Sequence, residues 1–202
     1  MLKNIFYAVL FGVGMAACLS QQDKKAEESS GSAPPAEATE TSEIAPNPSA
    51  FVVEKQGVGN IRIGMDITQM REQVPQGFTL NDTTLQLEGM QSTAYVLHPK
   101  EQPKGILVEQ SCNPDCKVWR ISVLSQEFRT AAGISVGSKY GEVQQAYNIR
   151  TVTFEEGNLV ALAPDAGMSF ILDHSSLQPD QLPQLKATTV PENLPVRKIL
   201  VY

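Results

Sequence analysis

The feature that most constrains the fold of this sequence is a pattern of apolar residues and glycine that occurs twice, 73 positions apart. The first copy spans residues 61–74 and the second spans residues 133–147. Each copy is typical of a short strand, a glycine turn and a short helix with one apolar stripe. The matching pairs are Ile61 with Ile134, Ile63 with Val136, Gly64 with Gly137, Ile67 with Tyr140, Met70 with Val143 and Val74 with Tyr147. We interpret this match as the trace of an internal duplication.

Two later segments continue the match. Residues 94–97 resemble residues 169–172 at a separation of 75, and residues 118–123 resemble residues 196–201 at a separation of 78. Small insertions in loops, which proteins tolerate, explain the growing separation. The alternative is that two unrelated amphipathic units have converged on one pattern.

Strands are predicted after each helix. Runs rich in β-branched, aromatic and aliphatic residues predict strands near 84–87, 93–97, 106–110, 118–124, 150–155, 158–162, 168–172 and 196–202. Short turns between consecutive strands favour antiparallel pairing. We therefore predict an α+β fold with two tandem helix-plus-antiparallel-sheet repeats, at about 51–128 and 129–202. Trp119, the only tryptophan, is expected to be in the core or half-buried.

Composition limits the class of protein. Hydrophobic residues make up 42% of the chain, which is enough for a packed core. The formal net charge is −6 and the isoelectric point is about 5.0, whereas nucleic-acid binding rewards clustered lysine and arginine. We therefore expect no nucleic-acid partner.

The N-terminus has the features of a targeting segment. Lys3 precedes an apolar run at residues 5–17, which is too short for a typical transmembrane helix. The run ends in Met-Ala-Ala-Cys at residues 15–18, which resembles the bacterial lipobox. The resemblance implies a signal peptide at residues 1–17, cleavage before Cys18 and acylation of this cysteine, with palmitate as a typical chain.

Several acyl chains on one residue would give a stable membrane anchor where one chain would not. Leu19 follows the cysteine, whereas Asp at that position is associated with inner-membrane retention, so the resemblance implies sorting to the outer membrane. The alternative is an ordinary secretory signal with a chance cysteine, which would leave a free thiol in an oxidising compartment.

Residues 18–50 are predicted to be the lipidated cysteine followed by a disordered tether. The segment is rich in Ser, Ala, Glu, Thr and Pro and has no apolar period. Between residues 19 and 50 it has six acidic residues and two lysines, so it cannot bury enough apolar surface to offset the entropy of ordering. Its acidic start is either a surface-export tag or a solvated spacer, and we favour the spacer.

Cys112 and Cys116 enclose Asn-Pro-Asp, a sequence that favours a turn between two predicted strands. Export through an oxidising compartment favours a disulfide between them. A redox-active pair is the alternative, although such pairs are usually Cys-x-x-Cys at a helix N-terminus. A zinc site needs four ligands, and His98 and His174 are the remaining strong candidates. We predict a structural disulfide and no metal or other cofactor.

The sequence gives little support to catalysis. Asp173, His174 and Ser175 are adjacent, but neighbouring residues in a strand point to opposite faces and do not easily form a relay. The sequence has no Gly-x-Ser-x-Gly elbow and no phosphate-binding loop. We therefore predict that the protein is not an enzyme. Residues 174–195 are a predicted surface loop, in which residues 178–195 are the first choice for a partner contact.

Together with the lipobox and the tether, three segments resemble the RpoE-regulated outer-membrane lipoproteins. These segments are residues 55–60, residues 120–124 leading to residues 130–137, and residues 196–200. The resemblance covers most of residues 51–202 and implies no biochemical activity that can be assigned to a residue.

We expect a non-catalytic module that is anchored to the outer membrane through lipidated Cys18, binds another envelope component and is linked to envelope stress. The expected location is the periplasmic face of this membrane, with exposure at the cell surface as the alternative. The alternatives are a structural protein that maintains the envelope and, less favoured, a hydrolase or a redox enzyme.

Overall fold

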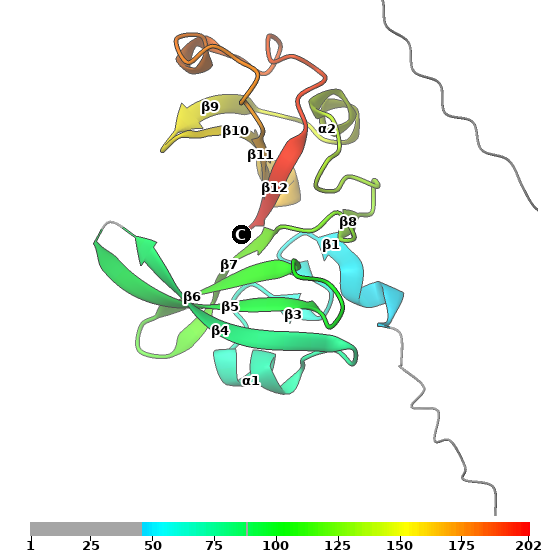
Figure 1. Ribbon diagram of the computed structural model, residues 1–202, viewed down its shortest axis with the longest axis vertical. Helices are drawn as coiled ribbons and strands as arrows, with labels where there is room; N and C mark the ends of the chain where they lie inside the picture. Colours follow the sequence, from blue (N-terminus) through cyan, green and yellow to red (C-terminus); the bar gives the residue numbers. More distant parts are fainter. Residues whose placement is uncertain (1–45, 88) are drawn as a thin grey trace, which may run out of the picture. The chain divides into compact units, whose positions relative to one another are not determined.

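A computed structural model describes residues 46–87 and 89–202 of the protein (Figure 1). These residues belong to one compact unit. The predicted signal peptide at residues 1–17, the predicted lipidation site at Cys18 and residues 19–45 of the predicted tether lie outside the described residues.

Eight strands form one antiparallel sheet (Figure 1). They are β4 (Phe78–Leu87), β5 (Met90–Pro99), β6 (Ile106–Cys112), β7 (Cys116–Val123), β9 (Thr151–Glu155), β10 (Asn158–Ala163), β11 (Met168–Leu172) and β12 (Val196–Val201). Their spatial order is β4-β5-β6-β7-β12-β11-β10-β9. All eight predicted strands are present. β4 and β5 are longer than predicted, because they are paired along their whole length, from the Phe78–Pro99 pair to the Leu87–Met90 pair.

The two halves of this sheet meet at β7 and β12, which are the last strands of the two meanders. Leu200 pairs with Ser122 and Val201 pairs with Ile121, in antiparallel register. Figure 1 shows β7 and β12 side by side between the other strands of the two halves. The central pairing therefore joins segments that are almost 80 residues apart in the sequence.

Two short helices follow the predicted apolar stripes. They are α1 (Ile67–Glu72), with Ile67 and Met70 buried, and α2 (Tyr140–Ala146), with Tyr140 and Val143 buried. In each helix the buried residues are three positions apart and so lie on one face. These four side chains belong to the same core cluster as the inward-facing residues of the large sheet.

A second, smaller sheet was not predicted as a separate element. Its strands are β1 (Val52–Glu54), β2 (Gly57–Val58), β3 (Ile61–Arg62) and β8 (Arg129–Thr130), in the order β3-β2-β1-β8. The β1–β8 pair is parallel. A 3₁₀ helix, η1 (Pro48–Phe51), precedes β1 and buries Ala50, so the last residues of the predicted tether are part of the fold.

The same backbone contact occurs in both halves. The Gly64 N–H donates to the Val118 carbonyl, and the Gly137 N–H donates to the Val196 carbonyl, each at 2.8 Å. Both glycines have a positive φ, 82° and 91°, a region that favours glycine. In each half this turn connects the segment before the helix to the last strand.

The fold is mixed but dominated by strands. Its core contains an aromatic group formed by Phe51, Phe78 and Phe128, whose ring centroids lie 5.2 to 6.4 Å apart. Two further 3₁₀ helices, η2 (Pro164–Ala166) and η3 (Leu182–Gln184), lie in connections of the second half. Within residues 46–87 and 89–202, none of the helices has the length and apolar character of a transmembrane span.

Candidate functional site

One face of the eight-stranded sheet packs on the helices, and we call the opposite face the outer face. Side chains alternate along a strand. Ile121 and Val123 of β7 belong to the core cluster, so Arg120 and Ser122 point to the outer face. By the same alternation, Leu200 of β12, paired with Ser122, lies on the outer face.

Two β-bulges interrupt this alternation, at matching places in the two halves. In the β6–β7 pair the register passes from Gln110–Val118 to Glu109–Arg120, which leaves Trp119 as the extra residue. In the β11–β12 pair it passes from Leu172–Val196 to Ile171–Lys198, which leaves Arg197 as the extra residue. A bulge re-aims side chains, and here it brings Trp119 and Arg197 to the outer face beside Arg120 and Lys198.

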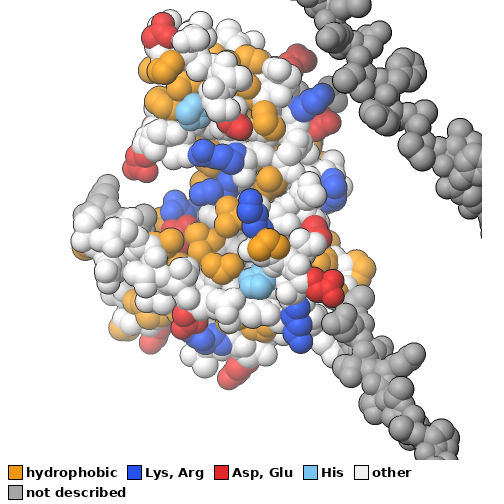
Figure 2. All heavy atoms as spheres, in the orientation of Figure 1, with side chains coloured by type: hydrophobic (Ala, Val, Ile, Leu, Met, Phe, Trp, Pro, Cys, Tyr) orange, Lys and Arg blue, Asp and Glu red, His pale blue; other side chains and the backbone are white. Residues whose placement is uncertain are grey.

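Aliphatic side chains form much of the outer face. Five of them point to this face, are partly exposed and lie outside the core cluster: Val96, Leu107, Val160, Leu162 and Leu200. Figure 2 shows hydrophobic side chains together with lysine and arginine side chains across the middle of the visible surface. The outer face is therefore apolar with embedded charges.

Positive side chains outnumber negative ones at the centre of the outer face. Arg120 donates to Glu109 from Nε at 2.8 Å and from Nη2 at 2.7 Å, and the Glu109 side chain is only 6% exposed. Arg197 donates from Nη2 to Oδ1 of Asn158 at 2.7 Å. Burial lowers the pKa of Lys198, with repulsion from Arg197 next in effect. Three cations thus lie near two carboxylates, Glu109 and Asp173, which leaves a local excess of positive charge.

Two aromatic residues lie at one end of the central strand pair. Trp119 is 50% exposed, and the Arg120 guanidinium carbon lies 4.6 Å from the centroid of its ring. Tyr202 is 43% exposed, and its hydroxyl lies 3.1 Å from Oγ of Ser169. Of the two positions predicted for Trp119, core or half-buried, the core position is wrong and the half-buried one is found, because the bulge turns the side chain out of the core side of the strand.

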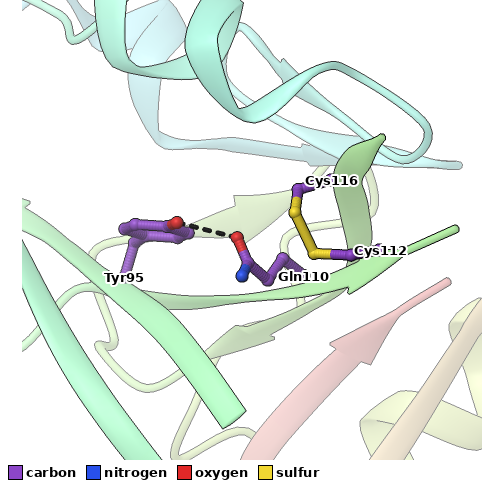
Figure 3. The surroundings of a disulfide bond; sticks show 4 residues. All are labelled: Tyr95, Gln110, Cys112 and Cys116. Carbon is purple, nitrogen blue, oxygen red and sulfur yellow. Dashed lines mark hydrogen bonds between the residues drawn. A yellow bond between two sulfur atoms is a disulfide. The ribbon is translucent and has the colours of Figure 1, made fainter. Parts of the chain in front are cut away.

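The predicted disulfide is confirmed. Cys112 and Cys116 are joined at an S–S distance of 2.01 Å and close the hairpin between β6 and β7 (Figure 3). Nearby, the Tyr95 hydroxyl donates to Oε1 of Gln110 at 2.7 Å, on the helix side of the sheet (Figure 3). The disulfide links β6 and β7 at the end of the hairpin, three residues before Trp119.

Both histidines make local contacts through their ring nitrogens. His98 contacts the Pro99 carbonyl through Nδ1 at 2.8 Å and Asn81 through Nε2 at 3.1 Å. His174 contacts the Gly157 carbonyl through Nε2 at 3.1 Å. Across the part of the chain that the structure describes, no group of three His, Cys, Asp or Glu side chains gathers as metal ligands would.

Asp173 is part of a turn. Its Oδ1 accepts a hydrogen bond from the backbone N–H of Ser175 at 3.0 Å, and this bond lowers the pKa of Asp173. In this arrangement the Asp173 carboxylate accepts a hydrogen bond from the backbone, whereas in a catalytic relay it would accept one from the ring of His174.

The long loop that was the first choice for a partner contact is packed on the domain. Its residues Leu182, Val190 and Leu194 are buried. The Ala187 carbonyl accepts hydrogen bonds from the hydroxyl of Tyr140 and from Nε2 of Gln144, both at 2.9 Å. The apolar side chains of this loop are committed to the fold, so the outer face is the stronger candidate for a contact.

A shallow, open depression of about 560 Å³ lies beside η1 and β8. It is lined by Pro48, Phe51, Val52, Glu127, Arg129, Thr130 and Ala131. The lining offers one cation and one carboxylate on an otherwise mainly apolar wall, and we regard it as secondary to the outer face.

The fold is similar to that of a solved structure, described as the crystal structure of the uncharacterized protein YfeY from Escherichia coli. The TM-score is 0.54 at 15% sequence identity, and the match covers 74% of this chain and 97% of that chain. At this identity the likeness concerns the fold alone. No protein-family model and no curated protein matches this chain.

Proposed function

We propose that the protein is a non-catalytic binding module of the bacterial envelope, anchored to the outer membrane by acylation of Cys18. The observation that carries the binding role is the outer face, which presents exposed Trp119 among aliphatic and cationic side chains. Tryptophan and arginine are enriched among the residues that dominate binding energy. Contiguous apolar surface on a soluble domain commonly marks an interaction site.

The anchoring part of the proposal rests on the lipobox resemblance at residues 15–18. Membership of the RpoE-regulated lipoproteins, a location facing the periplasm and a link to envelope stress rest on the sequence resemblance. The similarity to the YfeY structure supports the fold alone.

We also infer that the two halves derive from one duplicated unit. The support is the repeated order of helix and four-strand meander, the matching bulges at Trp119 and Arg197, and the equivalent hydrogen bonds of Gly64 and Gly137. Three separate features at corresponding positions are harder to obtain by convergence than one.

A structural role in envelope maintenance is the second candidate, because a lipid-anchored domain can stabilise a membrane without a specific ligand. A hydrolase or redox enzyme has less support, since His174 and Asp173 contact backbone groups and the cysteines form a hairpin disulfide.

The binding role is tested by placing a photo-crosslinking amino acid at position 119 and, as a matched control, at position 139. Lys139 precedes α2, which packs on the other face of the sheet. We expect capture of one defined component from position 119 only. Equal capture of abundant neighbours from both positions would favour the structural role instead.

The anchoring role is tested separately by metabolic labelling with a palmitate analogue. The wild-type chain should take up the label and fractionate with outer membranes, whereas Cys18→Ala should do neither. An unlabelled wild-type chain would remove the anchor from the proposal and leave the binding role to be judged on its own experiment.

A further inference from the structure

The centre of the outer face has a local excess of positive charge. Arg120, Arg197 and Lys198 lie there with two carboxylates. Glu109 is already held by Arg120, and Asp173, which attracts Arg197 from beyond ion-pair distance, accepts a hydrogen bond from the backbone N–H of Ser175. Within residues 46–87 and 89–202, neither Arg197 nor Lys198 has a carboxylate within 4 Å. The chain as a whole has a net charge of −6, but salt screens charges beyond about 10 Å, so the local excess decides which ligand is attracted.

The aliphatic part of the outer face suits a hydrocarbon better than a polypeptide. The backbone N–H and C=O groups of the inner strands are used in the sheet ladder, so a ligand lying on the face meets side chains only. Leu107, Val160 and Leu200 offer no hydrogen bonds. A peptide backbone placed on them would lose its hydrogen bonds to water without replacement, whereas an acyl chain has none to lose.

The aromatic residues at the end of the face are of the kind that prefers an apolar–polar boundary. Trp119 and Tyr202 are both partly exposed, and each has a large apolar ring with one polar group. Such side chains are enriched where hydrocarbon meets water in membranes.

We propose that the outer face binds a single anionic phospholipid, with its phosphate at Arg197 and Lys198 and its acyl chains along the aliphatic side chains that lead to Trp119. The inference rests on the proposed envelope location, since a domain anchored at Cys18 would stay close to lipid. It adds a ligand class and a site to the proposed binding role. The competing occupants are an acidic peptide and a free inorganic anion.

Trp119 is the only tryptophan in the protein, so its fluorescence reports on this face alone. The experiment uses the chain from residue 18 onward with Cys18→Ala, so that neither the apolar signal segment nor a covalent acyl chain competes. It is titrated with dihexanoyl phosphatidylglycerol below its micelle concentration. We expect a saturable blue shift of Trp119 emission and protection from acrylamide quenching, with a much smaller response to dihexanoyl phosphatidylcholine.

Charge variants on the outer face and away from it locate the headgroup. The double variant Arg197→Gln/Lys198→Gln should weaken binding at least tenfold, roughly the loss of 1.4 kcal/mol. Lys139→Gln removes one positive charge beside α2 and should bind as the parent does. Circular dichroism of each variant checks that the fold is kept, so that weaker binding is not a consequence of unfolding.

Three outcomes would overturn the lipid proposal. They are equal responses to the two lipids, an unchanged affinity of the folded double variant, and the same saturable response to inorganic phosphate or to polyglutamate in place of lipid. Photo-capture of a protein at position 119 without any lipid response would reject the lipid and leave the binding module standing. A lipid response without palmitate labelling of Cys18 would reject the anchor and leave the site standing.

Discussion

Arg120 holds Glu109 with two hydrogen bonds across β6 and β7, at 2.8 and 2.7 Å. The Arg120 side chain is 31% exposed and the Glu109 side chain 6% exposed, so the buried carboxylate takes both of these hydrogen bonds from one cation. The pair lies at the bulge that turns Trp119 outward, and it holds the guanidinium over the indole ring. This relationship links the stability of the sheet to the presentation of the outer face.

Removal of one partner should therefore be costly. We expect Arg120→Met to lower the free energy of unfolding by about 3 kcal/mol, because it leaves the Glu109 carboxylate buried without a partner. The double variant Glu109→Leu/Arg120→Met should regain most of this loss, since no buried charge remains. Urea unfolding of the single and double variants measures the difference, and equal stabilities for the two would contradict the prediction.

The glycines that precede the two helices should have equivalent roles. We expect Gly64→Ala and Gly137→Ala each to lower stability by about 1–2 kcal/mol, because a side chain is unfavourable at φ of 82° and 91°. A Cβ at either position would meet no atom within 4 Å, so the cost comes from the backbone and not from a clash. Asn, which tolerates this region, should cost less at both positions in thermal or urea unfolding. A cost at only one glycine would count against matching roles.

Tyr140 should make the protein sensitive to alkaline pH. Burial raises the pKa of Tyr140 to about 12, against 10.0 for an ordinary tyrosine. Between these values the unfolded chain loses a proton that the folded chain keeps, so stability is complete below pH 10 and falls as the pH rises toward 12. Tyr140→Phe should remove this part of the fall, at a cost of about 1 kcal/mol at neutral pH for the lost hydrogen bond to Ala187. Urea unfolding between pH 8 and pH 11 gives both quantities, and an unchanged alkaline slope in the variant would refute the assignment to Tyr140.

The disulfide should make a modest contribution. Because Cys112 and Cys116 close a loop of only five residues, chain entropy predicts that Cys112→Ser/Cys116→Ser lowers the free energy of unfolding by no more than about 2 kcal/mol. The fold should persist, and Trp119 fluorescence should follow its unfolding in urea. A double variant that fails to fold would show that the bond does more than close the hairpin.

The local elements could be predicted from the sequence because their causes are local. Apolar residues spaced by three predicted the buried stripes of α1 and α2, and alternation with short turns predicted the eight strands of the large sheet. The short spacing of Cys112 and Cys116 across a turn predicted their disulfide. In each case the residues that decide the structure lie within a few positions of one another.

A signal for the bulges was present but was not recognised. Val118 and Ile121 both point into the core although three positions separate them, and Val196 and Ile199 repeat this spacing. Strict alternation would place such residues on opposite faces, so one extra residue must lie between them. The exposed position of Trp119 follows from the extra residue between Val118 and Ile121.

By itself the sequence determined the helices, the strands, the hairpins and the cysteine pair, because each depends on the order of neighbouring side chains. Only the tertiary structure decided that β7 pairs with β12, that β1 pairs in parallel with β8, and that residues 182–194 pack on the domain. These contacts join segments far apart in the chain, and they depend on which strand edges and apolar surfaces remain free once the local elements have formed. The outer face exists for the same reason, since the central pairing of the two halves brings the side chains of β7 and β12 onto one surface.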